Sequence, residues 1–418
     1  MVDADRAAPD HAQHFAALIR ASHLLPPHDL PQLISTHAES MGYHDAVIYV
    51  VDLQQRLLIP FLPPDGPQGG GAPTALGVES TLAGRAFQQV ETLTHDEGAG
   101  RIRAWVPVLD GTERMGILAV TVEDPELLIP GSPAGGRALR FLASLVGELL
   151  ASKTMYGDAV VRLRRSAPMG LAAEVQWSLL PPLTFASRDV SIAAALEPAY
   201  QVAGDSVDYA VDPGRARFGI FDGMGHELLS AQLVGLVVAA YRNARRSGLG
   251  LVPATHHIED ALQQVFGGDA FVTGVLAELD TTSGVLTWVN AGHPPPLLIR
   301  HGRLVKTLEG EPRLPFGLGL DTSSEAEPTV GVDHLEPGDY LLLYTDGVTE
   351  ARSPGGELFG ADRLTDLVIR SLAAGLPASE TMRRAVNALL LHQQGNLSDD
   401  ATLLLAQWRP QHPESLLP

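Results

Sequence analysis

Aspartates recur at the ends of predicted strands in the C-terminal half of the chain. Asp222 and Asp346 each follow an apolar run and precede a glycine, and Asp205 itself follows a glycine. Asp399 and Asp400 come directly before a last apolar run. A sheet fixes the backbone and aspartate is short, so carboxylates placed this way suit hard divalent cations, which prefer oxygen ligands. Two such ions about 4 Å apart activate a water and neutralise a phosphoryl group.

The glycines and the absence of other machinery bear on the same interpretation. Gly223 has no Cβ, so its carbonyl can approach a metal closely. An Asp-Gly pair after a strand is more often a simple turn, and this explanation weakens when such acids recur in one domain. No Gly-x-Ser-x-Gly nucleophile motif and no P-loop occurs. Metal-activated water is therefore the more economical chemistry.

Two histidines lie beside these acids in the sequence. His226 follows the glycine-rich turn after Asp222, and His293 follows a predicted hairpin strand. Either could be a ligand or a general acid. A histidine that hydrogen-bonds loop backbone near the site is the favoured interpretation of both.

Composition excludes several classes of protein. The 418 residues, of which 45% are hydrophobic, suffice for two or three domains. A net charge of −20 argues against nucleic-acid binding, and the lack of cysteine excludes disulfides and thiolate metal sites. No apolar run approaches the ~20 residues of a membrane span, and the acidic N-terminus lacks the pattern of a signal peptide. We expect a cytoplasmic protein with no nucleic-acid or membrane partner.

The pattern of apolar residues divides the chain into four segments. Residues 1–152 are predicted to form an α+β domain, 153–183 a helical linker, 184–409 a strand-rich domain with inserted helices, and 410–418 a tail. In the first segment we expect a helix over 12–24, a strand over 46–51, a loop over 64–73, a hairpin over 105–122 around Asp110-Gly111, a break over 131–136 and a helix over 139–152.

The linker and the second domain have their own signals. Pro168 interrupts the linker, which either transmits a signal or spaces the domains, and the sequence leaves both open. In the second domain we expect strands at 190–196, 216–221, 340–344 and 402–408, a hairpin of 271–279 with 286–289, and helices at 228–246, 255–266, 361–374 and 378–394.

Together the motifs resemble those of PPM-type serine/threonine phosphatases, in the bacterial stage II sporulation protein E branch. They are residues 221–226 (FDGMGH), 290–294 (NAGHP), 344–350 (YTDGVTE) and 398–402 (SDDAT). Residues 175–181 (VQWSLLP) are similar to the helix that precedes that domain in the family. The resemblance covers about residues 170–408, in the family's order.

The resemblance implies an αββα sandwich with two Mn²⁺ or Mg²⁺ ions between its sheets. It assigns Asp222 as the bridge between the ions, the Gly223 carbonyl to one ion, and Asp346 with Asp399 to the other. Asp205 would lie close by, as a ligand directly or through water, and Asp400 is a less certain ligand. The implied activity is hydrolysis of phosphoserine or phosphothreonine on a regulatory partner similar to an anti-anti-sigma factor.

One motif departs from the family. The usual pattern Gly-Gly-Asp-aromatic-aromatic-Asp reads AGDSVD at residues 203–208, so the acids are kept and the aromatics are not. This puts the rate and the affinity for the second metal in doubt, rather than the fold.

The N-terminal segment is similar to a GAF domain, with a PAS-like fold as the alternative. The support is the strand at 46–51, the helix at 82–87, the hairpin at 104–122 and the helix at 139–152. The resemblance implies a sensor that binds a small ligand or forms a homodimer, the latter through helices within 139–180.

Two other functions stay open from the sequence. A regulatory binding module with a decayed site is disfavoured by the retained acids, although the altered surroundings of Asp205 leave room for it. A different two-metal enzyme, such as a nucleotide cyclase, is disfavoured because no basic or glycine-rich phosphate loop is found.

Overall fold

The computed structural model describes residues 11–66, 72–129, 136–197, 200, 204–225, 227–311, 313–318, 329–395, 397 and 399–410. Most of the predicted break at 131–136, the centre of the loop at 64–73, and nearly all of the predicted tail lie outside these ranges. The chain divides into two units, with the boundary between Ser166 and Ala167.

The N-terminal unit is built on one antiparallel sheet of six strands, in the order β3-β2-β1-β6-β5-β4. The predicted hairpin supplies two neighbouring strands of this sheet and turns at Gly111, where φ is +57°. The strands are β1 (His44–Val51), β2 (Leu57–Phe61), β3 (Leu76–Gly77), β4 (Leu93–Gly98), β5 (Arg101–Asp110) and β6 (Glu113–Val122).

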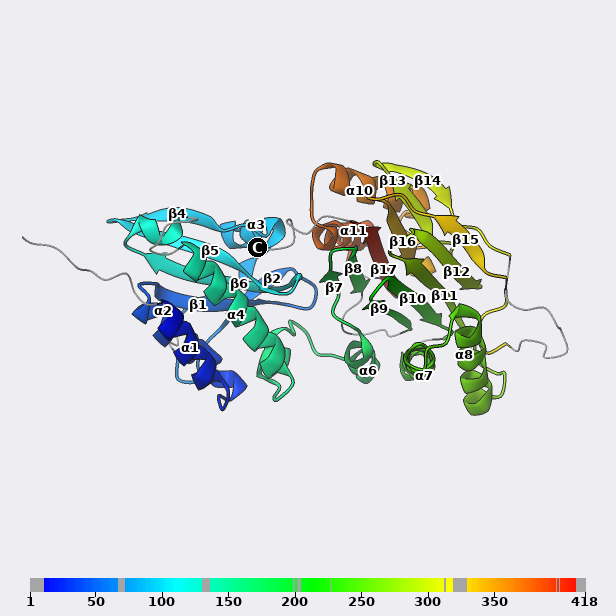
Figure 1. Ribbon diagram of the computed structural model, residues 1–418, viewed down its shortest axis with the longest axis horizontal. Helices are drawn as coiled ribbons and strands as arrows, with labels where there is room; N and C mark the ends of the chain where they lie inside the picture. Colours follow the sequence, from blue (N-terminus) through cyan, green and yellow to red (C-terminus); the bar gives the residue numbers. More distant parts are fainter. Residues whose placement is uncertain are drawn as a thin grey trace, which may run out of the picture. The chain divides into compact units, whose positions relative to one another are not determined.

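Helices cover both faces of this sheet (Figure 1). On one face, α1 (His11–Ser22), α2 (Leu30–Ser40) and α4 (Gly136–Thr154) bury a core with the sheet. On the other, α3 (Leu82–Gln89) packs through Phe87. The short elements are η1 (Pro27–Asp29), η2 (Pro125–Leu128) and α5 (Ala159–Leu163). The predicted helices and strands of this segment are thus confirmed.

The C-terminal unit contains two further antiparallel sheets. One has the order β15-β12-β11-β10-β9 and the other β14-β13-β16-β17-β8-β7. The strands are β7 (Thr184–Ala186), β8 (Val190–Glu197), β9 (Asp205–Asp212), β10 (Arg215–Gly223), β11 (Val272–Asp280), β12 (Val285–Ala291), β13 (Leu297–Arg300), β14 (Arg303–Thr307), β15 (Gly331–His334), β16 (Tyr340–Tyr344) and β17 (Ala401–Trp408).

The two sheets pack face to face between helical layers (Figure 1). Apolar side chains from both sheets, including Phe218, Trp288 and Trp408, form the core between them. Helices α7 (Glu227–Arg246) and α8 (Leu251–Phe266) cover the five-stranded sheet. Helices α10 (Ala361–Ala373) and α11 (Ala378–His392) cover the six-stranded sheet. Each sheet buries both faces, as this four-layer arrangement requires, and the expected αββα sandwich is confirmed.

The predicted linker 153–183 holds two short helices. After α4 ends at Thr154, α5 belongs to the N-terminal unit, and α6 (Leu171–Leu179) belongs to the C-terminal unit and packs on α7. The residues around Pro168 form no helix, as expected. Within the described ranges, no helix is both long and apolar enough to cross a bilayer.

The turn between β11 and β12 provides a test of the sandwich packing. Gly284 has φ +79°, and a Cβ there would lie 2.4 Å from the ring of Trp408. Gly214, in the turn before β10, has a similar φ of +75°, but its nearest neighbour would be 3.7 Å away. Gly214→Ala should therefore lower the free energy of unfolding by roughly 1–2 kcal/mol, because alanine is strained in a left-handed conformation. Gly284→Ala should lower it by a further ~1–3 kcal/mol, because its Cβ would also overpack against Trp408. Urea unfolding of the full chain measures both losses, and equal losses would contradict the role of Trp408.

Candidate metal centre

The topology brings the predicted acids together at one end of the two sheets. Asp205 begins β9 and lies opposite Asp222 of β10 in the strand register. Asp346 begins α9 (Asp346–Thr349), directly after β16. Asp399 and Asp400 lead into β17, which pairs with β16. Asp222 interacts electrostatically with Asp346, Asp399 and Asp400, so the sandwich gathers acids that are far apart in the sequence.

Asp205 is held by hydrogen bonds from the opposite sheet. Its side chain is 2% exposed, and Oδ2 accepts a hydrogen bond of 2.7 Å from the hydroxyl of Thr345. The same hydroxyl oxygen accepts the backbone N–H of Thr402 at 3.0 Å. This chain of hydrogen bonds runs from β17 through the end of β16 to β9, so it fixes the two sheets relative to each other at the site.

Asp400 makes a second connection between the sheets. Its Oδ2 accepts the backbone N–H groups of Gly204 and Asp205. The side chain is 3% exposed, and in the described part of the chain Oδ1 is buried without a hydrogen-bond partner. A buried carboxylate oxygen without a donor is costly unless a cation or a proton satisfies it.

Two glycines allow these close contacts. A Cβ on Gly347 would lie 1.8 Å from the carbonyl oxygen of Asp400, so only glycine lets the turn after β16 rest on the turn before β17. A Cβ on Gly223 would lie 2.8 Å from Val234 and 2.9 Å from the hydroxyl of Ser230. That hydroxyl donates a 2.8 Å hydrogen bond to the Gly223 carbonyl. The carbonyl keeps a second lone pair for another partner.

Burial and mutual repulsion raise the pKa values of these acids. The pKa of Asp222 rises to about 7, through burial first and then the charges of Asp346, Asp399 and Asp400. The pKa of Asp400 rises to about 6 through burial, which the N–H groups of Gly204 and Asp205 oppose. The pKa of Asp205 lies well above its ordinary value because it is buried beside Asp222 and Asp400.

The rest of the cluster is closer to solvent. Burial, and then Asp399 and Glu350, raise the pKa of Asp346. Asp399 is exposed and accepts the backbone N–H of Asp400 at 2.9 Å. The acids therefore extend from the buried Asp205 to the solvent-exposed Asp399, which gives a ligand access to the cluster.

Such a donor set fits divalent cations. It offers only oxygen atoms, carries excess negative charge, and contains an unsatisfied buried oxygen on Asp400. Within the described ranges, however, no three acids or histidines are already arranged to hold an ion. Like charges oppose close approach of the carboxylates, and a cation would remove that opposition.

His293 has a supporting place beside the acids. A 2.8 Å hydrogen bond joins its Nδ1 to the hydroxyl of Thr273, which lies opposite Asp222 in the register of β11. Burial lowers the pKa of His293 to about 3, so the ring is neutral near neutral pH. This favours a hydrogen-bonding role over a general acid: the ring bonds the hydroxyl of Thr273, and a hydrogen bond with the backbone of Tyr344 opposes the effect of burial on its pKa. His226 lies outside the described residues.

The second acid of the altered motif belongs to a different contact. Side chains alternate along β9, so Asp208 faces the opposite side of the sheet from Asp205. It is 1% exposed and pairs with Arg242 and Arg245 of α7. Arg242 also donates to the carbonyl of Leu179, the last residue of α6. Asp208 thus ties β9 to the helical layer and is not part of the acid cluster.

Sequence reasoning assigned no role to the hydroxyls that support the site. Thr345, Thr402 and Ser230 are fully buried. The hydroxyl of Thr345 donates to Asp205 and accepts the backbone N–H of Thr402. The hydroxyl of Ser230 donates to the Gly223 carbonyl. Thr345 and Thr402 stand within the two aspartate motifs, next to their acids or one residue away. That adjacency was the only signal available.

Comparison with known proteins finds a matching family and similar proteins. Residues 212–409 match the family described as Stage II sporulation protein E (SpoIIE). Phosphoserine phosphatase RsbU of Bacillus subtilis is 26% identical over 236 residues, which cover 56% of this chain and 68% of RsbU. Phosphoserine phosphatase RsbP of the same organism is 27% identical over 195 residues, 45% of this chain and 47% of RsbP. Protein IcfG of Synechocystis is 27% identical over 139 residues, 33% of this chain and 21% of IcfG.

Two solved structures are also similar. The RsbU and RsbW domains of a Mycobacterium tuberculosis protein are 27% identical, with a TM-score of 0.46, over 54% of this chain and 63% of that one. The SiaA-PP2C domain of Pseudomonas aeruginosa is 20% identical, with a TM-score of 0.47, over 62% of this chain and 99% of that one.

The family match spans all four motifs that carry the resemblance, including the bridge candidate Asp222. The resemblance predicted from those motifs is confirmed for this part of the chain, whereas the GAF-like assignment of the N-terminal unit stays a prediction. Residues 212–409 match the stage II sporulation protein E family, and the phosphoserine phosphatases RsbU and RsbP are similar to part of the chain.

Proposed function

We propose that the chain is a metal-dependent phosphatase that hydrolyses phosphoserine or phosphothreonine on a partner protein. The observation that carries the proposal is the cluster of Asp205, Asp222, Asp346, Asp399 and Asp400, whose shared negative charge is gathered where both sheets end. The family match and the phosphoserine phosphatases RsbU and RsbP support the same reaction.

Each residue of the site would have its own role in holding the ions. Asp222 lies among the other acids and would contact both ions, with the Gly223 carbonyl on one and Asp346 and Asp399 on the other. Asp205, fixed by Thr345, would contribute directly or through water. When bound, Mn²⁺ or Mg²⁺ ions supply phosphoryl charge neutralisation and an activated water. Neutral His293 holds Thr273 beside Asp222.

The partner is expected to be a phosphorylated regulatory protein similar to an anti-anti-sigma factor. This rests on the resemblance of the motifs to the family and on the similarity to the phosphoserine phosphatases RsbU and RsbP. Such a partner would place the reaction in the cytoplasm, where we expect the protein to act.

Helix α6 is the part of the chain that we propose as the control element. Gln176 is buried on α6, and its Nε2 donates a 2.5 Å hydrogen bond to the backbone carbonyl of Asp205. Val175 packs on Ala231 of α7. A shift of α6 would thus act directly on the strand that carries a site acid, which is what a two-state control element needs. The N-terminal sensor would bias that shift.

Asp222→Asn should reduce metal-dependent hydrolysis of a generic aryl phosphate by at least ~10²–10³-fold, because a carboxylate shared by the site is lost. Turnover of the unaltered protein should require Mn²⁺ or Mg²⁺ and vanish with a chelator. Asp333→Asn is the matched control: it removes an acid of the same unit that pairs with Lys306 on an outer strand.

Three results would contradict the assignment: undiminished turnover after metal removal, more than a tenth of the rate in Asp222→Asn, or an equal loss in Asp333→Asn. A folded chain that binds Mn²⁺ but has no turnover with any phosphorylated substrate would instead favour a catalytically weak binding module.

Stability without metal should fall as the pH rises. The folded-state pKa values of Asp222 and Asp400 lie above the ordinary value of an aspartate, at about 7 and about 6. Their contribution to stability is thus complete below about pH 4 and is lost as the pH rises through those values. Each group should lose up to ~1.4 kcal/mol for every pH unit between its unfolded and its folded pKa. Urea unfolding with chelator at about pH 5 and pH 7.5 measures the loss.

Asp222→Asn removes one of the titrating groups and should show a smaller loss between the two pH values. Identical pH dependence in the variant and the unaltered protein would show that Asp222 is not destabilised by its neighbours.

Gln176→Leu should change kcat with the proposed ligands untouched, because it removes the hydrogen bond to the Asp205 carbonyl. Ser178→Ala is the matched control on the same helix, since the Ser178 hydroxyl is exposed and, among the described residues, donates to the carbonyl of Val175 alone. Metal-saturated kinetics of the folded variants provide the measurement. If kcat and KM are the same in both variants and in the unaltered protein, α6 is a passive spacer.

A further inference from the structure

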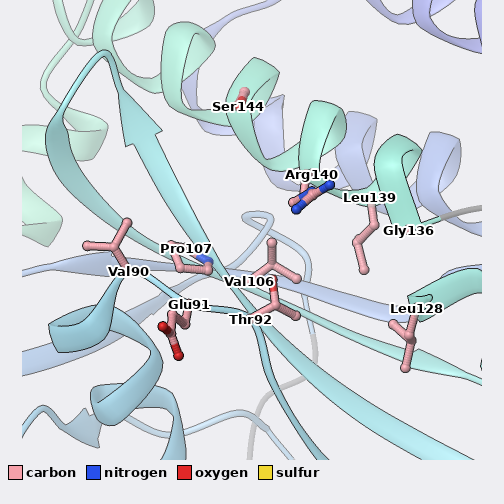
Figure 2. Close-up of a pocket in the computed structure, with 10 residues that line it drawn as sticks. All are labelled: Val90, Glu91, Thr92, Val106, Pro107, Leu128, Gly136, Leu139, Arg140 and Ser144. Atoms are coloured by element: carbon pink, nitrogen blue, oxygen red, sulfur yellow. The ribbon is translucent and has the colours of Figure 1, made fainter. Parts of the chain in front are cut away.

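A cavity of about 330 Å³ opens in the N-terminal unit (Figure 2). Its size is at the lower end of the range for small-molecule sites, which is roughly 300–1,000 Å³. It is lined by Val90, Glu91, Thr92, Val106, Pro107, Leu128, Gly136, Leu139, Arg140 and Ser144.

The cavity exists because one strand of the sheet ends early. Strand β4 pairs with β5 only as far as Leu93, opposite Trp105. Beyond that point Val106 and Pro107 continue β5 at an uncovered edge, and proline has no N–H with which to pair another strand. The first turns of α4 cross this edge and leave the space between helix and strand.

Two charged side chains reach the cavity from different elements. Arg140 extends from α4, and Glu91 from the segment after α3, which Val90 ends in a left-handed conformation with φ +56°. Figure 2 shows Arg140 on one side of Val106 and Pro107 and Glu91 on the other. In the described part of the chain, neither Glu91 nor Arg140 forms an ion pair.

The floor between the charges is apolar. Val106 and Leu139 are buried, and Leu128 packs against the same core. The hydroxyls of Thr92 and Ser144 add two polar groups that can donate or accept. The cavity therefore combines one positively charged side chain, one negatively charged side chain and an apolar surface. This combination is complementary to a small zwitterion with an apolar side chain.

We propose that this cavity binds an apolar α-amino acid. The ligand carboxylate would pair with Arg140, its ammonium group with Glu91, and its side chain would cover Val106 and Leu139. Both polar contacts would be charge-assisted hydrogen bonds. Glu91 and Arg140 are both exposed, so each stays solvated when unpaired, and a ligand with one charge would make only one of the two contacts.

Calorimetric titration of the full chain with L-leucine, L-valine, L-methionine and L-phenylalanine tests the proposal. At least one should bind with Kd near or below ~1 mM, the affinity of a weak specific ligand. Two analogues of leucine, 4-methylpentanoate without the ammonium group and 3-methylbutylamine without the carboxylate, should bind at least ~10-fold more weakly, a loss of ~1.4 kcal/mol.

Variants of the cavity residues test whether the amino acid binds in this cavity. Arg140→Gln and Glu91→Gln should each weaken binding at least ~10-fold, whereas Arg137→Gln should not. Arg137 is also exposed on α4, but it does not line the cavity. The proposal is overturned if none of the four amino acids binds up to about 10 mM, if either analogue binds as tightly as leucine, or if the two cavity variants bind as the unaltered protein does. Because phosphatase activity is not measured, the outcome is independent of the proposed function.

Discussion

Repulsion between carboxylates that the fold forces together is the constraint on which the C-terminal unit depends. Asp205 and Asp400 are buried, and Asp222 lies between them and the more exposed Asp346 and Asp399. Burial and like charges both favour the protonated forms, so the metal-free site opposes folding as the pH rises. A fold selected for stability alone would place apolar or hydrogen-bonded groups there, and a cation-binding site accounts for the acids instead.

The surrounding structure holds this repulsive cluster in place. The core between the sheets and the Trp408 contact with the β11–β12 turn fix the sandwich. Across its end, the hydrogen bonds from the Thr345 hydroxyl to Asp205 and from the Gly204 N–H to Asp400 join one sheet to the other. Ion pairs from Asp208 to α7 and the hydrogen bond from Gln176 anchor β9 to the helical layer. The position of Asp205 is therefore set by four separate parts of the unit: Thr345, Asp400, α6 and α7.

Much of this arrangement could be predicted from the sequence, because apolar periodicity and Asp-Gly motifs report directly on buried strands and on the turns that follow them. The weaker strands were missed for physical reasons. Arg303–Thr307 is exposed along most of its length and Gly331–His334 is short, so neither alternates clearly between apolar and polar residues. Asp205–Asp212 carries polar residues that only its neighbours satisfy. The hydroxyl of Ser230 gave no signal and that of Thr345 only its place beside Asp346, since the role of both depends on tertiary contacts.

The most direct test of a two-metal site is a crystal structure of the protein with Mn²⁺, using anomalous scattering at the manganese edge. We expect two manganese peaks on either side of the Asp222 carboxylate, with the Gly223 carbonyl at one, and Asp346 and Asp399 at the other. Ordered manganese elsewhere with none beside Asp222, or a saturated crystal in which the five acids contact no metal, would contradict it.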